Sequence, residues 1–291
     1  MSLLDSRSLS LLPLVALLAA CATKDAPKTA AVSDSTTPVA AAVPHQMTIV
    51  ATNYKFDAPD EVPAGMMTVH LVDNGSEMHH VAFVKLNDGK TMADLAEALK
   101  KTGPPPAWAV AHGGVNPPHP GGGMASATQL LEAGNYALLC FVPSADGVPH
   151  FARGMVHALT VTANSGAADA PAPTADIVMT LNSYTFTPSK PITAGKHTIR
   201  LENAGSQSHE LFLARLDPGK KAQDIPTWIM KMDGPPPAES MGGVPAMAPK
   251  MVSYFTADFI PGDYALICFL PDEKDGKPHF THGMIQQFHV D

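Results

Sequence analysis

The chain has 291 residues, a formal net charge of −8 and 16% charged residues. This length accommodates two ordinary domains. Phosphate contacts need clustered Lys and Arg, so an acidic chain without basic runs is not expected to bind nucleic acid. Its 28 prolines and 22 glycines favour a loop-rich β protein over a helical one.

Residues 1–21 have the features of an export signal. Arg7 supplies a positive charge, and the apolar run 9–20 has signal-peptide length but is too short to span a bilayer. The run ends in Leu18-Ala19-Ala20-Cys21, which resembles the bacterial lipobox; this resemblance implies that Cys21 is acylated and becomes the mature N-terminus. Ala22 is similar to the residue that directs Gram-negative lipoproteins to the outer membrane. A plain signal peptide with an incidental cysteine, or a buried apolar helix, remains an alternative.

The rest of the chain contains an internal repeat. Residues 22–45 are rich in Ala, Thr, Pro and Ser, which is typical of a flexible tether. Beyond them, segment 134–143 (GNYALLCFVP) matches 262–271 (GDYALICFLP), and other segments match at offsets of 128 to 131 residues. A Pro/Ala-rich linker at 164–175 separates the copies, so we expect duplicated domains at 46–163 and 176–291.

Each copy has the pattern of short strands separated by turns, which predicts an all-β protein. In the first copy the predicted strands are 47–54, 66–73, 80–86, 136–142 and 155–162. One helix is also expected, because Thr91-Met92-Ala93-Asp94 resembles a capping box and Leu95, Ala98 and Leu99 follow at helical spacing. Its counterpart lies at 222–232. The predicted architecture is an antiparallel β-sandwich with one short inserted helix per copy.

Four side chains with metal-binding chemistry recur in the same order in both copies. They are His79, Cys140, His150 and Met155 in the first copy, and His209, Cys268, His279 and Met284 in the second. A thiolate and two imidazoles suit copper in both oxidation states, and a thioether adds a weak axial bond. The alternatives are buried cysteines and methionines of a core, or a disulfide between Cys140 and Cys268.

The order of these residues resembles that of the cupredoxins, the blue copper proteins. Segment 208–211 (SHEL) is similar to their first-ligand segment, and 140–155 (CFVPSADGVPHFARGM) is similar to their ligand loop, above all to the longer loop of copper nitrite reductases. The resemblance covers nearly all of both copies. It implies two cupredoxin-like Greek-key β-sandwiches, each with a mononuclear type 1 copper site formed by the four side chains of its copy.

The ligand loops are longer than is usual in blue copper proteins. Nine residues separate Cys140 from His150, and ten separate Cys268 from His279. The extra residues are expected to bulge outward at 144–147 and 272–276, where Asp-Gly pairs favour turns. The length of the loops leaves open how close each cysteine lies to its histidine.

The residues before the two cysteines bear on catalysis. In multicopper oxidases and nitrite reductases a histidine directly precedes the ligand cysteine and reaches a second copper centre, whereas this chain has Leu139 and Ile267 there. We therefore expect a protein that is not an enzyme.

Further His and Met residues cluster in the first copy. They are Met78, His80, His112, His119 and Met124, and Met241 and Met247 occupy the matching region of the second copy. They are candidates for capturing copper ions. The Pro- and Gly-rich stretch 112–124 (HGGVNPPHPGGGM) favours the simpler interpretation, a flexible, solvent-exposed loop.

The function expected from the sequence is that of a lipid-anchored periplasmic cupredoxin that transfers electrons to or from a periplasmic redox protein. Two other hypotheses remain: a copper-handling protein without a redox role, and a metal-free scaffold that uses the sandwich only for its shape.

Overall fold

The structure is a computed structural model that describes residues 42–101, 105–164 and 170–291. The export signal, Cys21 and most of the tether lie outside the described residues. Within these ranges, no helix combines the length and apolar character needed to cross a membrane.

The described part of the first repeat contains strands, one α-helix and a short 3-10 helix. They are β1 (His45–Thr52), β2 (Lys55–Asp57), β3 (Glu61–Pro63), β4 (Gly65–Asp73), β5 (Val81–Leu86), α1 (Met92–Leu99), β6 (Ala109–Val115), β7 (Gly123–Leu131), β8 (Gly134–Leu139), the 3-10 helix His150–Arg153, and β9 (Val156–Thr162).

The second repeat follows with the same succession except for a counterpart of β3. Its elements are β10 (Ile177–Asn182), β11 (Thr185–Pro188), β12 (Gly195–Asn203), β13 (His209–Leu216), α2 (Asp224–Ile229), β14 (Ala238–Met247), β15 (Val252–Phe259), β16 (Gly262–Ile267), the 3-10 helix His279–His282, and β17 (Ile285–Val290).

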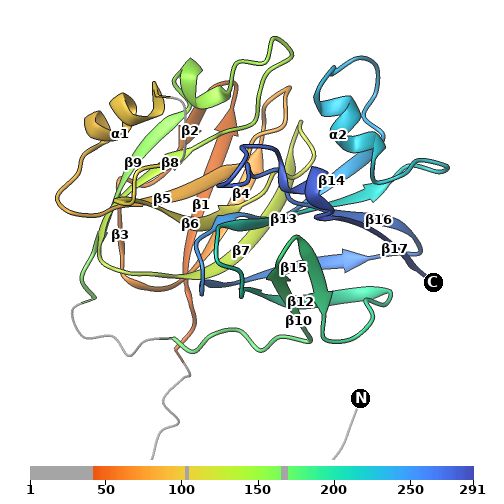
Figure 1. The fold of residues 1–291 in the computed structure, drawn as a ribbon. Coiled ribbons are helices and arrows are strands. Elements are labelled where there is room, and N and C mark those ends of the chain that lie inside the picture. The colour runs from red at the N-terminus through yellow and green to blue at the C-terminus, as the bar shows by residue number, and fades with distance from the viewer. Residues whose placement is uncertain (1–41, 102–104, 165–169) are drawn as a thin grey trace, which may run out of the picture. The chain divides into compact units, whose positions relative to one another are not determined.

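The strands form two sheets, and each sheet contains strands of both repeats (Figure 1). One sheet has the order β11-β10-β12-β15-β7-β4-β1-β2, and the other has the order β17-β16-β13-β14-β6-β5-β8-β9-β3. The repeats meet where β15 pairs with β7 and where β14 pairs with β6. The all-β class predicted from the sequence is confirmed, and the repeats are joined by strand pairing.

The pairing is mainly antiparallel, with parallel exceptions that the sequence did not suggest. Strand β1 pairs parallel with β4, and β10 pairs parallel with β12. In the first repeat the chain leaves the sheet of β1 to form β3, which pairs with β9 in the other sheet, and then returns as β4. A parallel pair needs such a crossover, because a tight hairpin joins only antiparallel strands.

Alternating side chains of the strands build the core. In β1, Met47, Ile49 and Ala51 are buried while their neighbours are not, as expected for a strand with one face against the core. Tyr136 and Tyr264 are the largest fully buried side chains. The Tyr136 hydroxyl donates to the carbonyl of Glu132 (2.9 Å), so its polar end is satisfied.

The predicted capping box begins helix α1 at Met92. The Thr91 hydroxyl accepts from the Asp94 N–H (3.2 Å), and the Asp94 carboxylate accepts from the Thr91 N–H (2.9 Å). Leu95 is the buried residue of α1 and packs into a small apolar cluster with Val84 and Leu139.

The stretch 112–124 is not the exposed loop that its composition suggested. His112 lies in β6 and is 8% exposed, and only the turn around His119 is exposed before β7 begins. The glycines allow β5 and β6 to approach each other closely, since a Cβ on Gly114 would lie 2.0 Å from the Val81 carbonyl oxygen. In the second repeat, Met247 is likewise a buried strand residue of β14.

Candidate metal centres

In each repeat the first histidine of the set follows a turn. A buried side chain at the end of the preceding strand stabilises this turn through hydrogen bonds. Asp73 accepts hydrogen bonds from the backbone N–H groups of Gly75 (3.0 Å) and His79 (2.8 Å). A Cβ on Gly75 would lie 2.4 Å from His79 Nε2, so glycine lets the ring lie directly against the turn. The turn delivers His79 just before β5 begins at Val81.

The second repeat closes this turn with an amide in place of the carboxylate. Asn203 Oδ1 accepts from the Gly205 N–H (2.9 Å), and Asn203 Nδ2 donates to the carbonyls of Met247 (2.7 Å) and Gln207 (3.0 Å). His209 is then the first residue of β13.

The long loop between the cysteine and the second histidine folds back on itself. In the first repeat Pro143 forms an isolated bridge with Pro149, and the extra residues 144–147 make a turn outside that bridge. Gly147 has a φ of 80°, which glycine adopts without strain. The second repeat forms the corresponding bridge and turn. The added length therefore does not separate cysteine from histidine.

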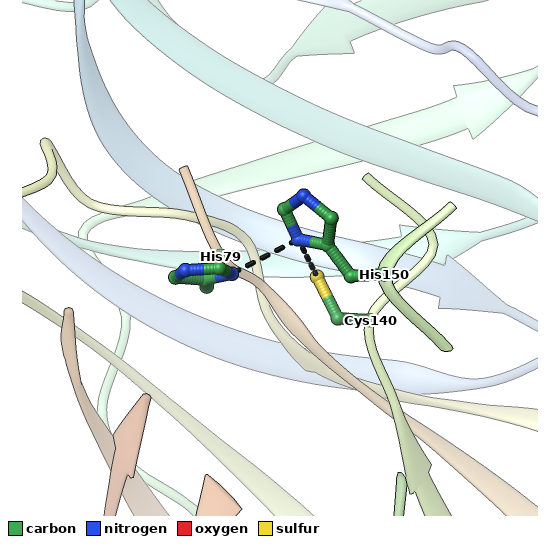
Figure 2. A group of neighbouring side chains, drawn as sticks. All are labelled: His79, Cys140 and His150. Carbon is green, nitrogen blue, oxygen red and sulfur yellow. Dashed lines mark hydrogen bonds between the residues drawn. The ribbon is translucent and has the colours of Figure 1, made fainter. Parts of the chain in front are cut away.

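The three donors of the first repeat converge in the interior (Figure 2). His150 Nδ1 lies 3.0 Å from His79 Nδ1 and 3.4 Å from Cys140 Sγ. All three side chains are fully buried.

The second repeat reproduces this arrangement. His279 Nδ1 lies 3.2 Å from His209 Nδ1 and 3.2 Å from Cys268 Sγ. Both Cys140 and Cys268 are free and face the histidines of their own repeat. The alternative of a disulfide between them is therefore wrong.

The two methionines are buried at the ends of the ligand loops. Met155 is fully buried; its N–H donates to the His150 carbonyl (3.0 Å), and its carbonyl accepts from the Cys140 N–H (3.3 Å). Met284 is also fully buried and makes the corresponding bonds in the second repeat (3.0 and 3.1 Å). The backbone thus ties each methionine to the cysteine and second histidine of its set.

Burial shifts the pKa values of the donors in opposite directions. It lowers the pKa of His79 and of His209 to about 4, so both imidazoles are neutral at pH 7 and free to bind a metal. It raises the pKa of the Cys140 thiol to about 12, and that of Cys268 well above its ordinary value. A thiolate therefore forms in these sites only when a cation replaces the thiol proton.

Hydrogen bonds outside the donor set determine which nitrogen of each first-repeat imidazole carries the proton. His150 Nε2 donates to Glu77 Oε2 (2.9 Å), and His79 Nε2 donates to Asn53 Oδ1 (3.0 Å). Both Nδ1 atoms then present lone pairs that face each other at 3.0 Å, an arrangement that a bound cation stabilises. Two neutral imidazoles and a thiol that becomes a thiolate fit copper.

Sequence reasoning missed the side chains that surround the donors. Tyr54 lies edge-on to His150, with ring centroids 4.9 Å apart, and its hydroxyl donates to Glu77 (2.8 Å). Tyr184 lies in the same way against His279 at 5.2 Å. Their matching positions in the repeat were a signal that could have identified the two tyrosines.

No protein-family model and no curated protein matches the chain. Among solved structures, it is similar to auracyanin from Roseiflexus castenholzii, with 25% identity, a TM-score of 0.29, and coverage of 42% of this chain and 99% of auracyanin. It is similar to a multicopper oxidase at 13% identity and a TM-score of 0.25, covering 84% of this chain and 88% of the oxidase. A copper nitrite reductase from Thermus scotoductus matches at 10% identity and a TM-score of 0.26, covering 86% of this chain and 62% of the reductase.

These matches correct the expectation that the chain is not an enzyme. The multicopper oxidase and the nitrite reductase are enzymes by name, so proteins with a similar fold include catalysts. Leu139 and Ile267 still leave each ligand cysteine without a preceding imidazole. That difference does not exclude catalysis.

The described part of the chain is thus an all-β protein in which two repeats share two sheets, and each repeat encloses its own His–Cys–His group as a candidate copper centre.

Proposed function

We propose that the chain binds one copper ion in each repeat and transfers electrons. The ligands are His79, Cys140, His150 and Met155 in the first repeat, and His209, Cys268, His279 and Met284 in the second. The observation that carries this proposal is the convergence of two Nδ1 atoms and one Sγ atom at 3.0 and 3.4 Å in the first repeat, and at 3.2 Å in the second.

The surroundings of the donors suit a centre that changes oxidation state. Copper supplies a one-electron couple in such a donor set. The protein holds the donors through the Asp73 or Asn203 turn and through the bridged ligand loop. Because all three donors of each site are buried and held by the backbone, little rearrangement is expected when an electron arrives or leaves.

The location of the protein is part of the proposal. An acyl group on Cys21 would anchor the chain to the cell envelope, at the outer membrane on the periplasmic side. Residues 22–45 would be the tether that lets the repeats extend away from the membrane. The partner would be a periplasmic redox protein. The domain limits 46–163 and 176–291 belong to the same proposal.

A reductive titration tests electron transfer directly. The copper-loaded protein should take up one electron for each site, and Cys140→Ser or Cys268→Ser should each remove the uptake of one site. Binding of Cu(I) without any reversible electron uptake would overturn the redox role and leave copper handling. Absence of bound copper after reconstitution would overturn the whole proposal.

A further inference from the structure

We infer that the two copper sites are not equivalent: the first repeat retains its copper, and the second is a weaker site that exchanges copper with the surroundings. This inference rests on the proposed function, since it concerns the same ligands. It comes from the side chains just outside the donors, which differ between otherwise matching sites.

In the first repeat both imidazoles are anchored through the nitrogen that points away from the donor cluster. His150 Nε2 donates to the Glu77 carboxylate (2.9 Å), and Glu77 is itself held by the Tyr54 hydroxyl (2.8 Å). His79 Nε2 donates to Asn53 Oδ1 (3.0 Å). Both imidazoles already have the tautomers that copper needs, so binding requires no proton to move from one ring nitrogen to the other.

The counterparts of these anchors in the second repeat serve other groups. Gln207 replaces Glu77, and its amide donates to Asp272 Oδ2 (2.8 Å). Ser183 replaces Asn53, and its hydroxyl donates to Asn182 Oδ1 (3.0 Å). Neither side chain therefore anchors an imidazole of the second donor set.

His279 shows the consequence. Its ring is fully buried, yet Nε2 has no hydrogen-bond partner among the described residues, and the nearest carboxylate oxygen among them, Asp272 Oδ2, is 3.9 Å away. When Nδ1 binds copper, the Nε2 proton must remain buried and unpaired, which weakens the bound state. Loss of such a supporting acceptor typically lowers metal affinity by about 10- to 100-fold.

The outer edge of the second site adds groups that can bind copper on its way in or out. Asp272, Asp275 and His282 place their ligand atoms within 4.8 Å of one another, and Asp272 is the carboxylate nearest His279 Nε2. His282 also lies over Tyr184, with ring centroids 5.0 Å apart. These three side chains offer a transient site for a divalent copper ion beside the buried donors.

The first repeat cannot offer the same path. Ser144 occupies the position of Asp272, and Arg153 occupies that of His282. The Arg153 guanidinium is paired with Asp146 and lies over the Tyr54 ring, 5.1 Å from its centroid. A guanidinium remains charged and does not coordinate metal ions, and it holds Asp146, the counterpart of Asp275, in an ion pair. The first repeat therefore has no equivalent of the Asp272 and His282 ligands at this edge.

The test compares the two sites in the full chain, with Cu(II) as the probe and a chelator of known affinity as competitor. Cys268→Ser leaves only the first site, and Cys140→Ser leaves only the second. We expect the first site to bind Cu(II) at least about tenfold more tightly and to release it more slowly. In these backgrounds Glu77→Gln should weaken the first site by about 10- to 100-fold, and the reciprocal Gln207→Glu should strengthen the second.

His282→Arg tests the path, because it installs the residue of the first repeat. It should slow copper exchange at the second site while leaving the equilibrium affinity nearly unchanged. Equal affinities and rates at the two sites, or no response to either reciprocal exchange, would overturn the inference. Copper binding at neither site would instead overturn the proposed function. If a serine variant does not fold, the same comparison can be made on the unmodified chain. A chelator should remove its copper in two kinetic phases of equal amplitude, one for each site. Glu77→Gln should make these two phases merge into one.

Discussion

Replacing Gly75 by alanine should damage the first copper site without touching the second. The added Cβ would lie 2.4 Å from His79 Nε2 and 2.6 Å from Asn53 Oδ1, whereas ordinary contacts begin at 3.4 Å. To bring this 2.4 Å distance to between 3.0 and 3.4 Å, the imidazole must retreat by about 0.6 to 1.0 Å. Metal–ligand distances tolerate only about 0.2 Å, so a shift of this size removes His79 from a productive position.

The expected loss is about 10- to 100-fold in Cu(II) affinity at the first site, because both the ligand and its Asn53 anchor are displaced. Overpacking should also lower the free energy of unfolding by about 1–3 kcal/mol. The assay is a chelator competition in the Cys268→Ser background, together with chemical denaturation of the metal-free protein.

Two glycines provide the controls. Gly205→Ala should impair the second site instead, since its Cβ would lie 2.6 Å from His209 Nε2. Gly89→Ala places its Cβ in open space, with nothing within 4 Å, and tests the effect of backbone strain alone at a φ of +67°. Unchanged copper affinity in Gly75→Ala would refute the reasoning, because the ring would then have room that the structure does not provide.

Three further substitutions test the fold. Thr91→Ala removes the cap of α1 and should cost about 1 kcal/mol of unfolding free energy in chemical denaturation; no loss would mean that the capping box contributes nothing. Tyr264→Phe removes the hydrogen bond from its hydroxyl to the Ile260 carbonyl (2.7 Å) and should also cost about 1 kcal/mol, a prediction that fails if stability is unchanged. Burial lowers the pKa of His112, so the stability that its neutral ring contributes is present above the unfolded pKa and lost as pH falls below it. His112→Gln should flatten the acid side of the pH–stability profile of the metal-free protein, and an unchanged profile would contradict this.

Local patterns were sufficient to predict five strands of the first repeat (β1, β4, β5, β8 and β9) and α1, but not β2, β3, β6 and β7. The mixed apolar run 66–73 corresponds to β4, and the capping box at Thr91 begins α1. These features depend on neighbouring residues, which the sequence displays directly. The pairing of β15 with β7 could not be predicted, because it joins strands more than a hundred residues apart and depends on how the repeats pack.

Glycine was misleading where two strands approach closely. Gly113 and Gly114 in β6 have φ values of 68° and 125°, in a region where the β5–β6 register shifts. Such glycines have the same appearance in a sequence as those of an exposed loop. The structure separates the two cases, since the neighbouring His112 is buried.

The order of candidate ligands was visible in the sequence, but their support was not. Cys140 and His150 could be named from the repeat, whereas the bridge of Pro143 with Pro149 that keeps them close appears only in the fold. Glu77 was hidden for another reason: it lies 73 residues before His150, and Gln207 replaces it in the second repeat.

The visible spectrum of the Cu(II)-loaded protein tests the central claim most directly. A thiolate bound to Cu(II) in either site should give an intense charge-transfer band at about 600 nm. The band should be reduced by Cys140→Ser, reduced by Cys268→Ser, and absent from the double variant. Loading with copper that gives no such band, or a band that persists in the double variant, would contradict the assignment of these cysteines as copper ligands.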